Sequence, residues 1–358
     1  MTKGIISDLN LPKAYPEPTK QVELVQTHIS YIFITDDFVY KIKKPVNFGF
    51  LDFSTLDKRL YYCQKEIELN KRLSPDIYLD VVPITDEGEK LKVSGEGEVV
   101  DYAVRMKKIP MDRIMVTLLE QGKLTPEMVK KVSKKIADFH SEAVTSSAIE
   151  QFGTINVIKT NTDENFEQTK EYIGKSITQN QFDTIKNYTN TFYKSKKELI
   201  KKRISDHRIK DCHGDLHMQH VCFADDIIIF DCIEFNERFR YSDTAADIAF
   251  LAMDLDYNGA FDLSKVLMDA YIQHSDDPGV LDMLNFYKVY RAYVRGKVIG
   301  FKLNDPQIPA DEKKAAQQTA KRYFSLALDY VKEEKREEKK EKKQEENKEE
   351  NVHGEGTS

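Results

Sequence analysis

The segment His213 to His217 (HGDLH) has the residue types of a catalytic loop, and Asp231 follows sixteen residues after Asp215. An aspartate directly after a His-Gly pair can accept the proton of an attacking hydroxyl group. A second aspartate at the end of an apolar run, here 227–230, can hold the divalent metal that carries nucleotide phosphates. Phosphoryl transfer depends on such a pair because the protein mainly positions reactants and neutralises charge. We therefore predict phosphoryl transfer, with Asp215 as the general base, Asp231 as the Mg²⁺ ligand and His213 as a residue that braces the loop.

Length and composition limit the possible domain number, partners and cellular compartment. The chain has 358 residues, enough for two domains or lobes, and its formal net charge of −6 gives no reason to expect a nucleic-acid partner. Its four cysteines form no C-x-x-C pair, which is typical of reduced thiols in a cytosolic protein. Residues 1–18 lack the features of a signal peptide, and no apolar run reaches the ~20 residues needed to span a bilayer. We expect a cytoplasmic protein that binds neither nucleic acid nor membrane. The sequence does not indicate its oligomeric state.

The first third of the chain has the pattern of a small β-rich lobe. Predicted strands lie at 31–35, 38–43, 78–84, 90–93 and 99–106. The first two flank an acidic turn and predict a hairpin, and alternation places Lys41 and Lys43 on the same face of its second strand. Ser54 can cap a helix that ends near Leu73, before Ser74-Pro75. We assign residues 1–20 to an N-terminal arm and 21–108 to a lobe that binds nucleotide phosphates.

The remainder of the chain is mainly helical. Predicted helices lie at 125–142, 163–202, 242–257, 261–274, 280–302 and 310–335, with two short strands near 221–223 and 227–230. The catalytic segment lies between the long helix and these strands, and is therefore expected on a loop. We predict an α+β fold of two lobes, in which a small N-terminal β-sheet lobe with one helix precedes a larger, mainly helical lobe over 109–331. This is the architecture of protein kinases. The Lys/Glu tail at 332–358 cannot bury apolar surface; it either extends the last helix through i,i+4 ion pairs or is frayed or disordered.

The order of these motifs resembles the aminoglycoside phosphotransferase family, relatives of the protein kinases, over most of residues 20–330. The motifs are Val-x-Lys on a predicted strand, with Lys41 as its lysine, then Glu66 within the predicted helix, the His-Gly-Asp loop and the strand-end aspartate. The resemblance implies ATP as the phosphate donor, Lys41 on its α- and β-phosphates, and Glu66 as the ion-pair partner of that lysine. Lys43 and Glu68 are the alternatives for these two roles.

A closer resemblance is to a poorly characterised bacterial subgroup of phosphotransferase-like proteins that are sometimes fused to a P-loop ATPase domain. The shared runs are Thr27 to Ser30 (THIS), Val39 to Pro45 (VYKIKKP) and Cys232 to Arg240 (CIEFNERFR). The sequence contains no G-x-x-x-x-G-K-[ST] motif, so we expect no such second domain in this chain.

Two positions depart from the family's pattern. The family places a metal-binding asparagine five residues after the catalytic aspartate, and His220 stands there in this chain. Imidazole suits Mg²⁺ poorly, so Gln219 or a water could substitute, or the site could prefer Mn²⁺, run slowly or only bind nucleotide. We keep His220 in the predicted metal set. The loop between the first strands is not glycine-rich, and we predict that His28 and Ser30 contact phosphate there.

Charged residues near and after the metal aspartate are candidates for binding the acceptor. They are Glu234, Glu237, Arg238, Arg291 and Arg295. The carboxylates suit a cationic small molecule and the arginines an anionic one such as a sugar phosphate, so the predicted partner is a hydroxyl-bearing small molecule of open class. Asp247 fits the family's aspartate that braces the catalytic loop; the alternative is a first-turn acid favoured by the helix dipole.

Two other functions stay open. The histidine at 220 favours a nucleotide-binding pseudokinase that serves as an interaction module, although the retained Asp215 and Asp231 argue against it. A metal-dependent phosphoesterase is the further alternative, because His213, Asp215, His217 and His220 form a His/Asp cluster. That class also needs an early Asp-x-His and a later Gly-Asn-His, and the sequence has neither.

Overall fold

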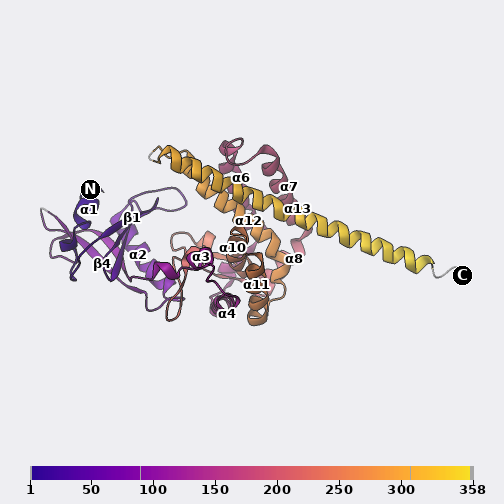
Figure 1. Ribbon diagram of the computed structural model, residues 1–358, viewed down its shortest axis with the longest axis horizontal. Coiled ribbons are helices and arrows are strands. Elements are labelled where there is room, and N and C mark those ends of the chain that lie inside the picture. Colours follow the sequence, from indigo (N-terminus) through magenta and orange to yellow (C-terminus); the bar gives the residue numbers. More distant parts are fainter. Residues whose placement is uncertain (1, 89, 307, 355–358) are drawn as a thin grey trace. The chain divides into compact units, whose positions relative to one another are not determined.

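The structure is a computed structural model that describes residues 2–88, 90–306 and 308–354, and its chain divides into two compact units (Figure 1). The β-rich unit comprises Met1–Lys135 and His213–Arg240, and the helical unit comprises Ile136–Cys212 and Tyr241–Ser358. The predicted catalytic segment therefore belongs to the same compact unit as the predicted phosphate-binding strands. The lobe boundary predicted at 108/109 stays a prediction.

One antiparallel sheet of six strands, in the order β1-β2-β3-β6-β4-β5, forms the centre of the β-rich unit. The strands are β1 (Glu23–Gln26), β2 (Ser30–Ile34), β3 (Phe38–Lys43), β4 (Tyr78–Asp86), β5 (Leu91–Val93) and β6 (Glu98–Lys107). The predicted hairpin and the three later strands are confirmed. The sequence pattern missed β1 because this edge strand buries little of its surface and so lacks apolar alternation.

Helix α2 (Leu56–Asn70) packs against β4 and β6. Its N-cap is Thr55, whose hydroxyl accepts a hydrogen bond from the amide of Lys58, and the prediction of Ser54 as the cap is wrong. The buried residues of α2 recur at helical spacing and include Cys63, Glu66 and Asn70. The helix thus presents a carboxylate on the face that packs against the sheet.

The segment predicted as an N-terminal arm is folded onto the sheet. It contains α1 (Thr2–Leu9) and the short 3₁₀ helix η1 (Pro12–Ala14). Leu9 and Tyr15 are buried in a hydrophobic cluster with Tyr40, and the Tyr15 and Tyr40 ring centroids lie 5.0 Å apart. The three prolines within residues 1–20 indicate an arm, and the apolar residues of this segment pack against one face of the sheet.

The rest of the β-rich unit surrounds the catalytic segment. Its elements are η2 (Met111–Arg113), α3 (Met115–Glu120), the beginning of α4 (Pro126–Glu142), η5 (Met218–His220), β8 (Val221–Phe223), β9 (Ile227–Ile229) and α9 (Glu237–Arg240). The two short strands predicted here are present as β8 and β9, and they pair as an antiparallel hairpin. The catalytic segment lies just before this hairpin and Asp231 lies just after it.

The helical unit holds most of the helices. Its elements are α5 (Ser147–Glu150), η3 (Gln151–Gly153), α6 (Ile155–Thr169), η4 (Lys170–Tyr172), α7 (Gln179–Ser195), α8 (Lys197–Ser205), β7 (Ile209–Asp211), β10 (Tyr241–Asp243), α10 (Thr244–Tyr257), α11 (Phe261–Ser275), α12 (Val280–Gly300), η6 (Phe301–Leu303) and α13 (Ala310–Gly354). The single helix predicted over 163–202 is wrong. Gly174 interrupts it with a φ of 81°, and Thr178 starts α7 with a capping box.

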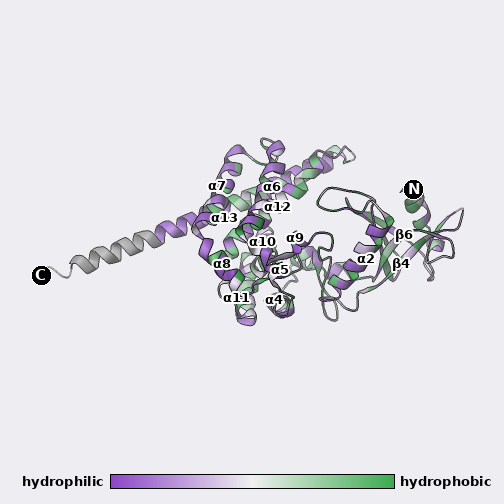
Figure 2. Cartoon of the chain, turned by 180° about the vertical axis from the view of Figure 1, so that it is seen from behind, coloured by the Kyte–Doolittle hydropathy of each residue, from purple (hydrophilic) through white to green (hydrophobic). Residues whose placement is uncertain are grey.

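Helix α10 is buried along nearly its whole length and packs against α11 and α12, while α12 packs against α13. Asp243 caps α10 by accepting a hydrogen bond from the amide of Ala245. Beyond the packed part, α13 continues through 332–340 as a hydrophilic helix (Figure 2). The backbone of the predicted tail is thus helical to Gly354, and 355–358 lie outside the described residues. Among the described residues, no helix is both long and apolar enough to cross a membrane.

Candidate active site

His213 fixes the catalytic loop to the hairpin that follows it. Its Nδ1 accepts a hydrogen bond from the amide of Asp215 at 3.2 Å, so Nε2 carries the hydrogen and donates to the carbonyl oxygen of Phe230 at 2.9 Å. Gly214 has a φ of 86°, and a Cβ there would lie 2.9 Å from the carbonyl oxygen of Phe239. Only glycine fits this turn without strain, and the two constraints together set the position of Asp215.

Asp231 lies two residues after the end of β9 and adopts the left-handed region, with a φ of 62°. Aspartate tolerates this conformation better than most residues, and such strained positions cluster at functional sites. Its amide donates a hydrogen bond to the hydroxyl of Tyr78 at 3.0 Å, and its Oδ1 accepts one from Lys41 Nζ at 2.6 Å. The side chain of Asp231 is still 41% exposed, so the carboxylate is both anchored and open to a ligand.

Two lysines of β3 converge on the buried carboxylate of Glu66. Lys41 Nζ lies 2.8 Å from Oε1 and Lys43 Nζ lies 2.7 Å from Oε2. Lys43 also pairs with Glu234. Glu68, the alternative partner, is on the exposed side of α2 and pairs with Lys65. The predicted Lys41–Glu66 pair is therefore present, and the competing lysine shares the same carboxylate.

The charges of this network stabilise one another. Burial alone would lower the pKa of Lys41, but the carboxylates of Asp231 and Glu66 hold it well above its usual value. Burial would raise the pKa of Glu66, and the two ammonium groups lower it instead. The pKa of Asp231 is likewise held below its usual value, against the effect of burial, mainly by Lys41. Lys41 is thus a fixed cation between two carboxylates.

Polar residues at the C-terminal end of α2 and in the loop after it tie this network to the segment around Asp231, and sequence reasoning missed them. Asn70 Nδ2 donates to the carbonyl oxygen of Glu66 and its Oδ1 accepts from the amide of Cys232, each at 2.8 Å. Ser74 exchanges hydrogen bonds with the backbone of Ile229. The available signal was the i,i+4 spacing of Glu66 and Asn70, which places both on one helix face.

His220 lies between the two predicted catalytic aspartates. Its Nδ1 is 2.9 Å from the carbonyl oxygen of Asp215, and its Nε2 is 3.5 Å from Oδ2 of Asp231. Burial lowers the pKa of His220 to about 4, with help from His217 and against the pull of the two carboxylates. The ring is therefore neutral near pH 7, and a carbonyl can only accept, so Nδ1 carries the hydrogen.

Asp215 is one-third exposed, with Oδ2 lying 3.5 Å from Nε2 of His217. Asp215, His217 and His220 bring potential metal-ligand atoms within 4.8 Å of one another. His213, the fourth member of the cluster that suggested a phosphoesterase, has both ring nitrogens bonded to the backbone. The geometry therefore favours Asp215 as a partly exposed general base over a metal site formed by all four residues.

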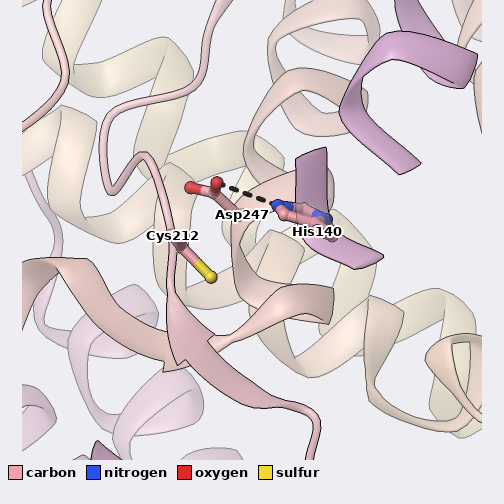
Figure 3. A group of neighbouring side chains, drawn as sticks. All are labelled: His140, Cys212 and Asp247. Carbon is pink, nitrogen blue, oxygen red and sulfur yellow. Dashed lines mark hydrogen bonds and ion pairs between the residues drawn. The ribbon is translucent and has the colours of Figure 1, made fainter. Parts of the chain in front are cut away.

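A second His/Asp cluster lies in the helical unit and is fully buried (Figure 3). His140 Nε2 is 3.2 Å from Oδ2 of Asp247, and its Nδ1 is 2.8 Å from the hydroxyl of Tyr271. The thiol of Cys212 donates to the carbonyl oxygen of Ser242, and burial raises its pKa well above the usual value. Asp247 thus hydrogen-bonds a helix histidine; its predicted role in bracing the catalytic loop stays a prediction.

The residues predicted to contact phosphate from the first turn differ in exposure. His28 is exposed in the turn between β1 and β2. Ser30 is 1% exposed and lies opposite Lys43 in the β2–β3 pair. The two side chains therefore lie on the same, buried face of the sheet. A phosphate contact through the Ser30 hydroxyl is not supported by this placement.

The predicted acceptor residues fall into two groups. Glu237 is exposed and Arg238 half-buried on α9, where ligands can reach them. Glu234 is buried against Lys43, and Arg291 is buried with its Nε donating to the carbonyl oxygen of Ala246. Arg295 is half-buried with its guanidinium over the ring of Tyr323. Acceptor binding by Glu234 and Arg291 is not supported, because both side chains are committed to buried contacts.

Comparison with known proteins identifies the fold. No known family profile matches the chain. Uncharacterized proteins of Mycobacterium tuberculosis and Mycobacterium bovis are each 28% identical to it over 293 residues, which are 81% of this chain and 57% of the relative. The chain thus spans little more than half the length of these curated relatives.

Two solved structures share the fold across nearly the whole chain. The GDP complex of aminoglycoside 2'-phosphotransferase-IIIa matches with a TM-score of 0.50 and 12% identity, over 90% of this chain and 97% of that one. A candidate aminoglycoside phosphotransferase from Ralstonia eutropha matches with a TM-score of 0.51 and 12% identity, over 92% and 98%. The chain therefore has the two-lobed, protein-kinase-like α+β fold of aminoglycoside phosphotransferases, as its motifs predict.

Proposed function

We propose that the protein is an ATP-dependent phosphotransferase that moves the γ-phosphate to a hydroxyl group of a small molecule. One observation carries the proposal: Lys41 Nζ lies 2.8 Å from Glu66 and 2.6 Å from Asp231. A lysine held by a helix glutamate beside an open aspartate is the arrangement that binds nucleotide phosphates in kinase-like enzymes. The match to aminoglycoside phosphotransferase structures supports the same reaction class.

The residues around Asp231 fit a divalent cation. Lys41 bonds Oδ1 of Asp231, while Oδ2 faces Nε2 of His220 at 3.5 Å, and the aspartate is partly exposed. Asp231 and His220 would hold the ion. When bound, it would neutralise the charge of the nucleotide phosphates.

The remaining groups position the reactants. Glu66 holds Lys41 where its ammonium can contact phosphate oxygens of ATP. His213 holds the loop so that the partly exposed carboxylate of Asp215 can accept the proton of the acceptor hydroxyl. The acceptor oxygen bonds to the γ-phosphorus as the bond from that phosphorus to the β,γ-bridging oxygen breaks, and ADP leaves.

The proposal is tested by phosphate transfer to a panel of hydroxyl compounds: sugars, aminoglycosides, choline-like alcohols and nucleosides. Phosphorylated product from one of these classes is expected with the wild-type protein. Asp215→Asn should lower turnover about 10²- to 10⁴-fold, because the general base is lost, while ATP still binds. Asp225→Asn, an exposed aspartate in the turn between β8 and β9, is the matched control and should keep full activity.

Two results would contradict the proposal. Full turnover in Asp215→Asn would remove the general base from the mechanism. ATP binding without transfer to any hydroxyl compound would favour the pseudokinase alternative.

A further inference from the structure

We infer that the cation at this site is bound through an imidazole nitrogen, Nε2 of His220, together with Oδ2 of Asp231. The site then takes a transition-metal ion of the Mn²⁺ type in preference to Mg²⁺. This inference rests on the proposed function and deepens it, since it names the class of ion that accompanies the nucleotide.

The hydrogen bonds of His220 fix which nitrogen can bind a metal. Nδ1 lies 2.9 Å from the carbonyl oxygen of Asp215, which can only accept, so Nδ1 donates its hydrogen there. If Nε2 also carried a hydrogen, it would form a charge-assisted hydrogen bond with Asp231 at about 2.7–2.9 Å. The observed separation is 3.5 Å. Nε2 therefore presents a lone pair to the carboxylate.

Two electron-rich atoms that face each other repel unless a cation lies between them. The separation of 3.5 Å between Nε2 of His220 and Oδ2 of Asp231 lets one ion bind both, because metal bonds to imidazole and carboxylate are about 2.0–2.2 Å long. The hydrogen bond from Nδ1 to a backbone carbonyl is the usual support of a metal-bound histidine.

Neighbouring rings hold the imidazole in this orientation. The His217 ring centroid lies 4.0 Å from that of His220, and the Phe230 ring centroid lies 5.6 Å from it. The side chain of His220 is 13% exposed. The nitrogen ligand is therefore preorganised before an ion arrives.

The same hydrogen bonds direct the ion toward Asp231 and away from Asp215. The His220 atom that lies 3.7 Å from Oδ2 of Asp215 is Nδ1, whose hydrogen is donated to the backbone. The ion and the acceptor hydroxyl are thus assigned to different aspartates.

The choice of ion follows from ligand chemistry. Mg²⁺ prefers oxygen ligands, whereas Mn²⁺ and the later divalent ions of the first transition row also accept imidazole nitrogen. The resembling family offers an asparagine oxygen at this position, and this chain offers nitrogen. Histidine in place of asparagine at position 220 therefore changes which ion is preferred, while the ion still binds at the same place.

The test is pulsed electron paramagnetic resonance of the Mn²⁺–ATP complex of the protein. The spin echo should be modulated by a directly coordinated nitrogen, and ¹⁵N labelling of the protein but not of ATP should change that modulation. Calorimetric titrations of ATP should show tighter binding with Mn²⁺ than with Mg²⁺, because imidazole suits the transition-metal ion. In His220→Asn the nitrogen modulation should vanish and the preference for Mn²⁺ should fall.

Controls separate the possible failures. His207→Asn, which changes an exposed histidine of the helical unit, should keep the nitrogen signal. His220→Gln and thermal unfolding of each variant guard against loss of the fold, and the labelling experiment on the wild-type protein needs no variant. Mn²⁺–ATP binding without protein nitrogen would overturn the inference and leave the proposed function standing. A wild-type protein that binds no ATP with either metal would overturn both.

Discussion

The two His/Asp clusters of this protein contain similar residues and differ in what their side chains face. In the helical unit, His140, Cys212 and Asp247 are all buried and make hydrogen bonds within the protein. In the β-rich unit, Asp215 and Asp231 are 34% and 41% exposed. Residue type alone does not distinguish the two clusters. Exposure and the direction of the lone pairs favour a ligand site in the β-rich unit and a structural role for the buried cluster of the helical unit.

This difference predicts that substitutions will separate the clusters by their effects. Changes in the buried cluster should lower stability, because a buried polar partner left unsatisfied costs free energy. Substitutions of the partly exposed Asp215 and Asp231 should mainly affect ligand binding and turnover. The Lys41–Lys43–Glu66 network combines both properties, since it is buried and also holds the lysine of the site.

The largest loss of stability is expected for Glu66→Ala. The change leaves the ammonium groups of Lys41 and Lys43 without their shared buried carboxylate, and breaking a buried ion pair costs about 3–5 kcal/mol. Urea unfolding measures the loss. Glu68→Ala on the exposed side of the same helix should change stability by no more than about 0.5 kcal/mol. Equal stabilities of the two variants would show that the network is not the structural centre of the β-rich unit.

A smaller loss is expected for Asp247→Ala in the helical unit. The change removes the buried acceptor that faces Nε2 of His140 and should lower the free energy of unfolding by about 2 kcal/mol. Mn²⁺ affinity of the folded protein should not change. Asp262→Ala, an exposed first-turn acid of α11, is the control and should cost less than about 1 kcal/mol. Loss of Mn²⁺ binding in Asp247→Ala would move the metal site to the buried cluster.

The smallest effect is expected for chelation and for Cys212→Ala. If hydrogen bonds alone hold the buried cluster, a chelator should leave the midpoint of thermal unfolding unchanged. Replacement of the thiol should cost about 1 kcal/mol through lost packing and one weak hydrogen bond. A clear fall in the unfolding midpoint on chelation, absent in Cys212→Ala, would instead reveal a structural metal at His140, Cys212 and Asp247.

Much of the site could be predicted because strands and helices impose simple periods. Alternation along β3 places Lys41 and Lys43 on one face, and helical spacing favours Glu66 over Glu68. The sequence predicts Lys41 as the partner of Glu66 with Lys43 as the alternative, and in the structure both lysines pair with that carboxylate, each through a different oxygen.

Other positions could not be predicted because their environment comes from distant segments. Ser30 is buried beside its strand partner Lys43, and Arg291 is buried with its guanidinium over the ring of Phe250. The tautomer of His220 depends on a backbone carbonyl whose direction no sequence pattern encodes. The break in the predicted helix 163–202 had a signal in Gly174 and Thr178, which the apolar period obscured.

The central claim is that a nucleotide and a divalent ion bind at Asp231. Calorimetric titration of ATP tests it most directly, with Mg²⁺, with Mn²⁺ and without metal, for the wild type, Asp231→Ala and the exposed control Asp225→Ala. We predict metal-dependent binding in the wild type and the control, and none in Asp231→Ala. Equal ATP binding by all three proteins, or binding that needs no metal, would contradict the account.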